Sequence, residues 1–212
     1  VAGINQSQGQ PEIDYTFANG LRSILRQDPD IIMVGEIRDS ETASLAVQAS
    51  LTGHLVLATI HTNNASGVVP RLIDMGVEAY LIAATLILAL GQRLVPALCP
   101  DSKEAIAVDG AIKVMVDKQL EGIPQQYRQD LVVPEKLYRA QRSATCPGGT
   151  RGRLGVFEVL EMTKEIEDVL LKNPIESEIE RVARAGGLTT MRDDALFKAF
   201  EGLIPFEEVA KL

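Results

Sequence analysis

Apolar residues form two short continuous runs in the first third of the chain, and helix-like patterns lie around them. The runs are at 31–34 (IIMV) and within 54–61 (HLVLATIH). Continuous apolar strands of this kind occur where a parallel sheet is covered on both faces. Strands that alternate with helices predict a parallel α/β sheet.

The helices around these strands have recognisable ends. A first helix, with apolar residues at helical spacing from Phe17, should end before Pro29, because proline lacks an amide donor. Asp39 or Ser40 caps a second helix, and Gly53 ends it. The stretch 77–95 (VEAYLIAATLILALGQRLV) predicts one long apolar helix.

The character of the chain changes near residue 100. Charge rises and prolines interrupt the periodicity as far as about residue 152, and a short strand and several amphipathic helices are predicted after it. We therefore expect three parts: 1–98, an α/β core; 99–152, an excursion that is hairpin-like or helical over 103–145; and 153–212, a small, mainly helical subdomain. Residues 3–8 (GINQSQ) add a weak edge-strand signal.

Length and composition describe a globular protein that can bury a core, with 212 residues of which 46% are hydrophobic. A net charge of −8 argues against nucleic-acid binding, which requires clustered Lys and Arg. The most apolar stretch, 79–90, has 12 residues, whereas a membrane-crossing helix needs about 20, so no direct membrane insertion is expected. Two cysteines cannot form a disulfide framework, which favours a reducing cytoplasm. A start at Val1, without an initiator Met or a signal-peptide pattern, suggests a piece of a longer protein.

An acidic residue stands where the first apolar run ends, because Gly35 and Glu36 follow IIMV. Ligands of parallel α/β sheets bind at the carboxyl ends of the strands, so Glu36 points to the expected site. A carboxylate there can take a proton from an attacking water, or hold a water on Mg²⁺, beside a phosphate chain. Gly35 lets the backbone come close. An acid at such a place is more often solvated or a helix cap, so this pattern alone is weak evidence of catalysis.

The chain contains two histidines, His54 and His61, which bracket the second apolar run. Because His61 ends that strand, it should emerge at the same edge of the sheet as Glu36. An odd separation points the two rings to opposite faces of a regular strand, which argues against one shared metal. From the residues alone, two interpretations of His61 stay open: a phosphate sensor, and a buried imidazole with its hydrogen bonds satisfied. His54 leans toward a structural role.

Several stretches resemble one family. VGEIRD at 34–39 is similar to the atypical Walker B segment of the secretion-superfamily ATPases of type II secretion and type IV pilus assembly. TGHLVLATIHT at 52–62 is similar to their histidine box. The likeness continues at 91–100, 151–160 and 191–209, so it covers nearly the whole chain. It implies that 1–98 belongs to a partial RecA-like core and that 99–152 is a degenerate cysteine region.

The resemblance also implies roles for single residues. Glu36 would be the catalytic glutamate, and His61 would lie near the γ-phosphate of ATP. His54 would be the other histidine of the box, and Arg38 matches the arginine of the Walker B segment. Arg93, in GQRLV, is open to two interpretations: an approach to the adenine side of the nucleotide, and a charge at a helix end near its last carbonyl groups.

Members of this family form hexameric rings and couple hydrolysis of Mg·ATP to the assembly of pilins or pseudopilins. The resemblance therefore implies a bacterial homo-oligomeric motor, cytoplasmic and peripheral at the inner membrane, with a membrane platform protein as its partner. It does not separate pilus assembly from type II secretion. A DNA-translocating motor would share the core but should carry basic patches, against which the charge balance argues.

One departure from the family is a missing motif, because no G-x-x-x-x-G-K-[ST] pattern occurs in the sequence. The phosphate-cradling loop of the family would lie upstream, so these residues alone are expected to hydrolyse ATP slowly or not at all. Loss of the strand before that loop would expose strand edges, which favours dimers, swapped segments or added strands. The alternative function is a non-catalytic module for oligomer or partner contacts, derived from such an ATPase.

A second departure concerns the two cysteines. Cys99 and Cys146 stand in CPDS and CPGG, where Ser102 and Gly149 replace the partner cysteines of assembly and secretion members. Two thiolates without a nearby histidine cannot complete a tetrahedral zinc shell, so zinc is not expected. Whether the two cysteines pair directly stays open, and a Cα separation beyond about 7 Å would exclude it.

Overall fold

The structure is a computed structural model that describes residues 3–13, 15–129 and 131–212. Its contacts divide the chain into two compact units. Unit 1 takes the described residues within Val1–Ile87 together with Met162–Ile179, and unit 2 takes those within Leu88–Glu161 together with Glu180–Leu212. Each unit is therefore built from two separate stretches of the sequence.

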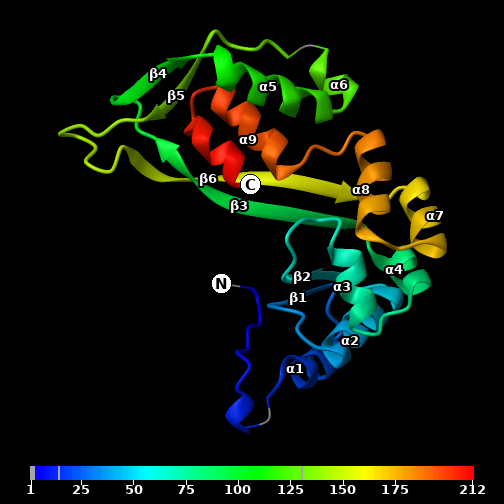
Figure 1. Cartoon of the computed structure of the whole chain (residues 1–212). Coiled ribbons are helices and arrows are strands. Elements are labelled where there is room, and N and C mark those ends of the chain that lie inside the picture. The colour runs from blue at the N-terminus through cyan, green and yellow to red at the C-terminus, as the bar shows by residue number, and fades with distance from the viewer. Residues whose placement is uncertain (1–2, 14, 130) are drawn as a thin grey trace. The chain divides into compact units, whose positions relative to one another are not determined.

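Unit 1 contains a pair of parallel strands with helices packed against them (Figure 1). Strand β1 (Ile31–Val34) pairs in register with β2 (Leu55–Ala58). The other elements are η1 (Pro11–Ile13), α1 (Phe17–Ile24), η2 (Leu25–Gln27), α2 (Ser40–Leu51), α3 (Val68–Asp74), α4 (Ala79–Thr85), α7 (Lys164–Lys172) and the beginning of α8 (Glu176–Ala185).

The helix ends of unit 1 follow the predicted chemistry. Helix α1 and η2 end before Pro29. Of the two candidates for the cap of α2, the structure selects Asp39, whose carboxylate accepts the Thr42 amide at 2.8 Å. Gly53 follows that helix with a φ of 102°, a value that glycine adopts at little cost. The edge strand predicted at 3–8 is absent from its described residues, and only an isolated bridge forms nearby.

Strand β1 has one buried face and one exposed face, whereas in β2 Val56 is half-buried and the other residues are exposed. Ile32 and Val34 are buried, whereas Ile31 and Met33 are 61% and 73% exposed. Leu55 and Leu57 are exposed on the same face as their register partners in β1. The prediction of strands covered on both faces is therefore wrong for the described residues. The described residues of unit 1 bury only the face of β1 that carries Ile32 and Val34.

Unit 2 is organised around two antiparallel strand pairs. Strand β3 (Leu88–Leu98) pairs with β6 (Thr150–Glu161), and β4 (Lys103–Ala107) pairs with β5 (Lys136–Ala140). The unit also contains α5 (Gly110–Gly122), α6 (Gln125–Arg128), the end of α8, α9 (Met191–Phe200) and η3 (Phe206–Lys211). Its core includes the side chains of Val95, Val116, Ile123, Leu137, Val156, Met191, Ala195, Leu196, Ala199, Ile204, Phe206 and Val209.

The long apolar helix predicted at 77–95 is wrong. Helix α4 stops at Thr85, and β3 begins at Leu88. In β3 the buried Ala89 lies between the exposed Leu88 and Leu90, which is the two-residue period of a strand. Pairing with β6 decides the conformation, since a short apolar run has no periodicity of its own that separates helix from strand.

The excursion predicted at 99–152 contains both structures that were considered for it, a hairpin-like strand pair and helices. The excursion belongs to the same compact unit as β3, because β6, which follows it, pairs with β3 along most of the length of β3. The domain boundaries predicted at 98 and 152 stay a prediction. Among the described residues, no helix has both the length and the apolar character needed to cross a bilayer.

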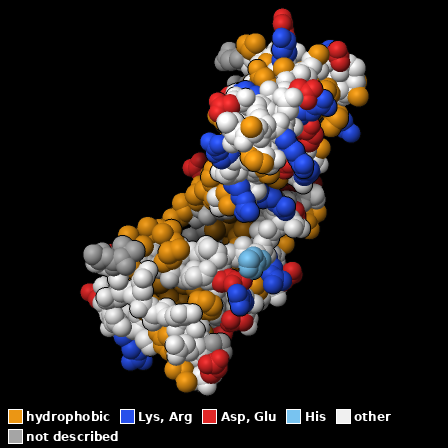
Figure 2. Space-filling view, turned by 90° about the vertical axis from the view of Figure 1, so that its left-hand side faces the viewer, with side chains coloured by type: hydrophobic (Ala, Val, Ile, Leu, Met, Phe, Trp, Pro, Cys, Tyr) orange, Lys and Arg blue, Asp and Glu red, His pale blue; other side chains and the backbone are white. Residues whose placement is uncertain are grey.

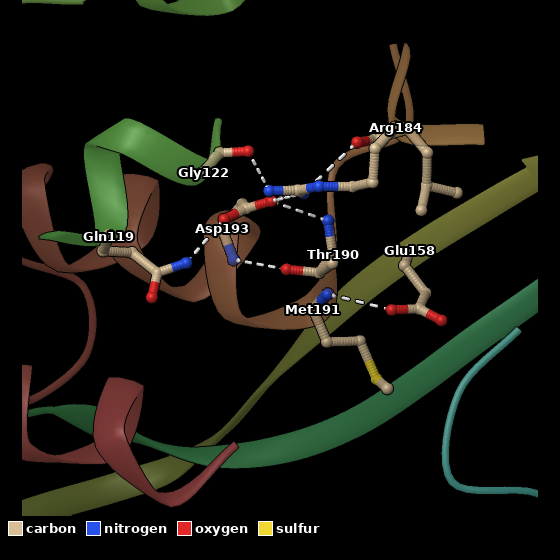
Figure 3. Close-up of polar contacts among 8 residues, drawn as sticks. Gln119, Gly122, Glu158, Arg184, Thr190, Met191 and Asp193 are labelled. Carbon is tan, nitrogen blue, oxygen red and sulfur yellow. Dashed lines mark hydrogen bonds and ion pairs between the residues drawn. The ribbon is translucent and has the colours of Figure 1, made fainter. Parts of the chain in front are cut away.

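A buried polar cluster joins three helices of unit 2 (Figure 3). Asp193 at the start of α9 is fully buried, and its carboxylate forms an ion pair with Arg184 of α8. It also accepts the side-chain amide of Gln119 on α5 at 2.6 Å and the Thr190 backbone amide at 2.9 Å. Arg184 donates in addition to the carbonyl of Gly122 at the end of α5. Burial of a carboxylate costs free energy, and hydrogen bonds and an ion pair of this kind offset that cost.

Candidate active site

The carboxyl ends of β1 and β2 lie together because the two strands are parallel and in register from Ile31–Leu55 to Val34–Ala58. Glu36 follows the end of β1, and His61 follows the end of β2. The structure brings them into contact, with His61 Nε2 at 2.8 Å from Glu36 Oε1. Arg38 forms an ion pair with the other carboxylate oxygen, Oε2. The expectation that the acid and the histidine emerge at one edge agrees with this geometry.

The Glu36 carboxylate is the sheltered member of this cluster. Its side chain is 13% exposed, whereas those of Arg38 and His61 are 68% and 87% exposed. The hydrogen bond from Arg38 lowers the pKa of Glu36, and the charges of Arg38 and His61 lower it further against the opposing effect of burial. Glu36 is therefore an ionised carboxylate at neutral pH. The same contact raises the pKa of Arg38.

The site is open to solvent on the histidine side. Figure 2 shows a histidine side chain at the surface with acidic and basic side chains next to it, in agreement with the exposure of His61. The buried-imidazole interpretation of His61 is therefore wrong. A ligand can approach the exposed ring, which lies directly beside the sheltered carboxylate.

The contacts of Gly35 within the chain do not require a glycine, whereas Thr59 bonds to the backbone on both sides of Glu36. A Cβ atom at Gly35 would lie 3.4 Å from the Phe17 ring, an ordinary contact distance. Thr59 donates its hydroxyl to the Gly35 carbonyl at 2.6 Å and accepts the Ile37 amide at 2.8 Å. Sequence reasoning missed Thr59, although its place directly after an apolar strand was a usable signal.

The loop after His61 is held by local hydrogen bonds and by one contact with a residue far along the sequence. Thr62 donates to the Asn64 carbonyl at 2.8 Å, and the side chain of Asn64 donates to Glu176 at 2.7 Å. Asn64 also accepts the Gly67 amide. No local pattern in the sequence indicates the contact with Glu176, because the two residues are 112 positions apart.

His54 lies at the opposite end of β2. Its Nδ1 donates to the Ala49 carbonyl at 2.9 Å, and Thr52 lies within hydrogen-bond distance of the same nitrogen. His54 therefore stabilises the connection between α2 and β2, and the structure does not bring it to Glu36. A direct role in nucleotide binding finds no support in this position.

Arg93 lies in the middle of β3 in unit 2, opposite Val156 of β6. Its interpretation as a charge at a helix end is therefore wrong, because no helix ends there. The other interpretation, an approach to the adenine side of a nucleotide, stays a prediction.

The two cysteines are joined. Cys99 and Cys146 form a disulfide with a Cα separation of 6.6 Å, below the limit set above. Ser102 is buried, and its hydroxyl has no hydrogen-bond partner among the described residues. Across those residues, no group of three or more His, Cys, Asp or Glu side chains is arranged to hold a metal ion.

Comparison with known proteins gives the same family throughout. A family model described as "Type II/IV secretion system protein" matches residues 1–211. Type II secretion system ATPase E of Vibrio cholerae is 45% identical over 213 residues, which cover 100% of this chain and 40% of the relative. Type IV pilus assembly ATPase PilB of Thermus thermophilus is 43% identical over 210 residues, which cover 99% of this chain and 23% of the relative.

Solved structures agree on the fold. The ATPase DotB of Legionella pneumophila matches with a TM-score of 0.64 and 27% identity, covering 97% of this chain and 44% of that one. The architecture is thus a partial RecA-like α/β core with additional elements. The chain spans about 40% of the length of the secretion relatives that it matches.

Proposed function

The chain belongs to the family of type II/IV secretion system proteins, and we propose that it is the carboxyl-terminal part of a motor ATPase that drives type IV pilus assembly or type II protein secretion. Two of the relatives are named as ATPases, which supports ATP hydrolysis as the reaction. The single observation that carries the proposal is the ionised, sheltered Glu36 in contact with His61 at the carboxyl edge of a parallel sheet. The activity belongs to the full-length protein, because the chain covers well under half of these relatives.

The proposed reaction is in-line attack of water on the γ-phosphate of ATP. Glu36 accepts the proton of that water, a role that requires the ionised form which the Arg38 contact favours. The exposed His61 ring lies at hydrogen-bond distance from Glu36, so it can meet the γ-phosphate beside the base. Gly35 and Arg38 flank the base in the chain and belong to the same nucleotide-binding edge.

Mg²⁺ is the expected companion of the nucleotide. This ion keeps several waters and is held in such sites by one or two carboxylates together with substrate phosphates. Glu36 is a carboxylate at this edge that could hold a water of the ion, once a ligand displaces Arg38 or His61 from one of its two oxygens. Bound Mg²⁺ would neutralise charge on the phosphate chain, while Glu36 handles the proton of the attacking water.

The intact motor is proposed to be a homohexamer in the cytoplasm, peripheral at the inner membrane, where it acts on a platform protein. The exposed apolar face of β1 and β2 supports this part of the proposal, because exposed apolar patches often mark contact surfaces. The 212 residues alone are expected to hydrolyse ATP slowly or not at all, since they lack a phosphate-cradling G-x-x-x-x-G-K-[ST] motif.

The test is ATP hydrolysis by the full-length protein in the presence of Mg²⁺, with the wild type compared with Glu36→Gln. The Gln variant should bind nucleotide and lose turnover by at least about 100-fold, because an amide cannot accept the proton. Glu41→Gln, which alters an exposed glutamate paired with Arg22, is the matched control and should turn over as the wild type. A wild type that stays inert even with its membrane partner would favour the alternative of a non-catalytic contact module.

A further inference from the structure

The backbone that carries Glu36 departs from the regular pattern of the sheet. Val34 pairs with Ala58, so a regular parallel ladder would continue with the Glu36 amide donating to the Thr59 carbonyl. In the structure the Ile37 amide makes this bond instead, at 2.8 Å. The segment that follows β1 and contains Glu36 therefore has one extra residue here, relative to the segment that follows β2.

Such an insertion has a consequence for the side chain. In a strand, successive side chains point to opposite faces, so a slip of one residue changes where each following side chain points. Extra residues of this kind are used near active sites to redirect a side chain. Glu36 lies within the segment that carries the extra residue, and its side chain contacts His61, which follows β2.

Thr59 holds this departure on both sides. Its backbone carbonyl accepts the amide of Ile37, after Glu36, and its hydroxyl donates to the carbonyl of Gly35, before Glu36, at 2.6 Å. In a regular ladder the Gly35 carbonyl would point away from β2, because backbone groups alternate between the two edges of a strand. The hydroxyl thus provides a hydrogen bond to a carbonyl that the slip has turned toward β2.

We propose that Thr59 is a positioning residue that fixes the orientation of the Glu36 carboxylate through these two bonds. The proposal rests on the proposed function, in which Glu36 accepts a proton from the attacking water. Thr59 contacts the backbone on both sides of the base, and its task is to aim the carboxylate. Its loss should therefore lower the rate of the chemical step more than the affinity for nucleotide.

The experiment compares three variants of the full-length protein. Thr59→Val keeps the shape of the side chain and the carbonyl bond but removes the hydroxyl, and Thr59→Ser retains the hydroxyl. Thr85→Val is the matched control, because the Thr85 hydroxyl donates to the Leu81 carbonyl at 2.7 Å within α4, remote from the base in the sequence. Unfolding midpoints of all variants show whether each one is folded.

The expected result is a fall in kcat of roughly 10- to 100-fold for Thr59→Val, since misplacement of a reacting group by about 1 Å costs rates of this order. KM for ATP should change by less than about two-fold, which indicates that binding is untouched. Thr59→Ser should recover most of the rate, and Thr85→Val should behave as the wild type. Hydrogen exchange at the Ile37 amide should become faster in Thr59→Val only.

Several outcomes would overturn the proposal while the ATPase assignment stands. These are a wild-type kcat in Thr59→Val, a rate loss that Thr59→Ser or Thr85→Val shares, or a change confined to KM. The Glu36→Gln variant in the same assay tests the assignment itself. Hydrogen exchange at the Ile37 amide can be measured without ATP hydrolysis. Unchanged exchange in Thr59→Val therefore counts against the positioning role whether or not the protein hydrolyses ATP.

Discussion

Arg38 and His61 occupy both oxygens of the Glu36 carboxylate, and each has its own effect on it. The Arg38 bond is the largest cause of the lowered pKa of Glu36. A lower pKa keeps the base ionised over a wider pH range, although it also weakens the attraction of the base for a proton. The structure therefore predicts that Arg38 sets the acid limit of the reaction.

The variant Arg38→Ala tests this at the level of one residue. Without the guanidinium, the pKa of Glu36 should rise toward its ordinary value. Activity is lost as the pH falls through this pKa, because the protonated carboxyl cannot accept a proton. The acid limb of the kcat profile of the full-length protein should therefore move to higher pH. Arg22→Ala, which removes an exposed arginine paired with Glu41, should leave the limb in place.

Sequence reasoning was effective for residues whose place follows from strand polarity. Glu36 and His61 each follow an apolar strand, and parallel pairing brings strand ends together whatever the remaining structure is. Thr59 and the Asn64–Glu176 contact were not predicted. The first depends on a slip of one residue in the ladder, and the second depends on where residue 176 arrives in space.

At the scale of elements, unit 2 depends on a buried charge. Helices α5, α8 and α9 meet at Asp193, which has no exposure and three partners of different kinds. The same residue completes a capping box with Thr190 at the start of α9. One side chain thus joins a local helix start to packing between helices.

Asp193→Ala should destabilise the chain by about 3–5 kcal/mol, because it leaves Arg184 with an uncompensated charge in a site where its side chain is 20% exposed. Urea unfolding of residues 1–212 followed by circular dichroism measures the change. Asp117→Ala is the matched control, since it removes an exposed pair with Lys113 on α5 and should cost at most about 1 kcal/mol. Equal losses for the two variants would contradict a special role of the buried pair.

The element assignment succeeded where caps are strong and failed in the longest apolar stretch. Asp39 and Gly53 mark their helix in the sequence because their side-chain and backbone chemistry acts locally. The change from α4 to β3 is not marked in this way. Leu88 and Leu90 suit a buried helix as well as a strand, and only the partner strand β6, sixty or more residues later, distinguishes the two.

At the scale of the whole molecule, neither unit is a continuous piece of sequence. Helix α7 lies beyond β6 in the chain and packs against α4 of unit 1. Ile166 and Leu170 of α7 are buried, as is Ile82 of α4. The stability of the part that carries Glu36 therefore depends on residues about 130 positions away in the sequence, at 162–179.

Leu170→Ala should cost about 2–5 kcal/mol, the usual result of removing a buried leucine side chain. Hydrogen exchange in residues 1–212 should show loss of protection in α4, although the substitution lies in α7. Leu171→Ala alters the neighbouring leucine, which is 56% exposed, and should leave exchange nearly unchanged. Protection of α4 that survives Leu170→Ala would show that residues 1–87 are stable by themselves.

The bond between Cys99 and Cys146 also acts at this scale, because it turns the intervening chain into a closed ring that holds β4, α5, α6 and β5. A linear chain is divided into two molecules by one cut. A ring is opened by one cut and remains in one piece. A single break of the backbone anywhere between these cysteines therefore leaves the part with β1 and β2 covalently linked to the part with α9, until a reductant opens the disulfide.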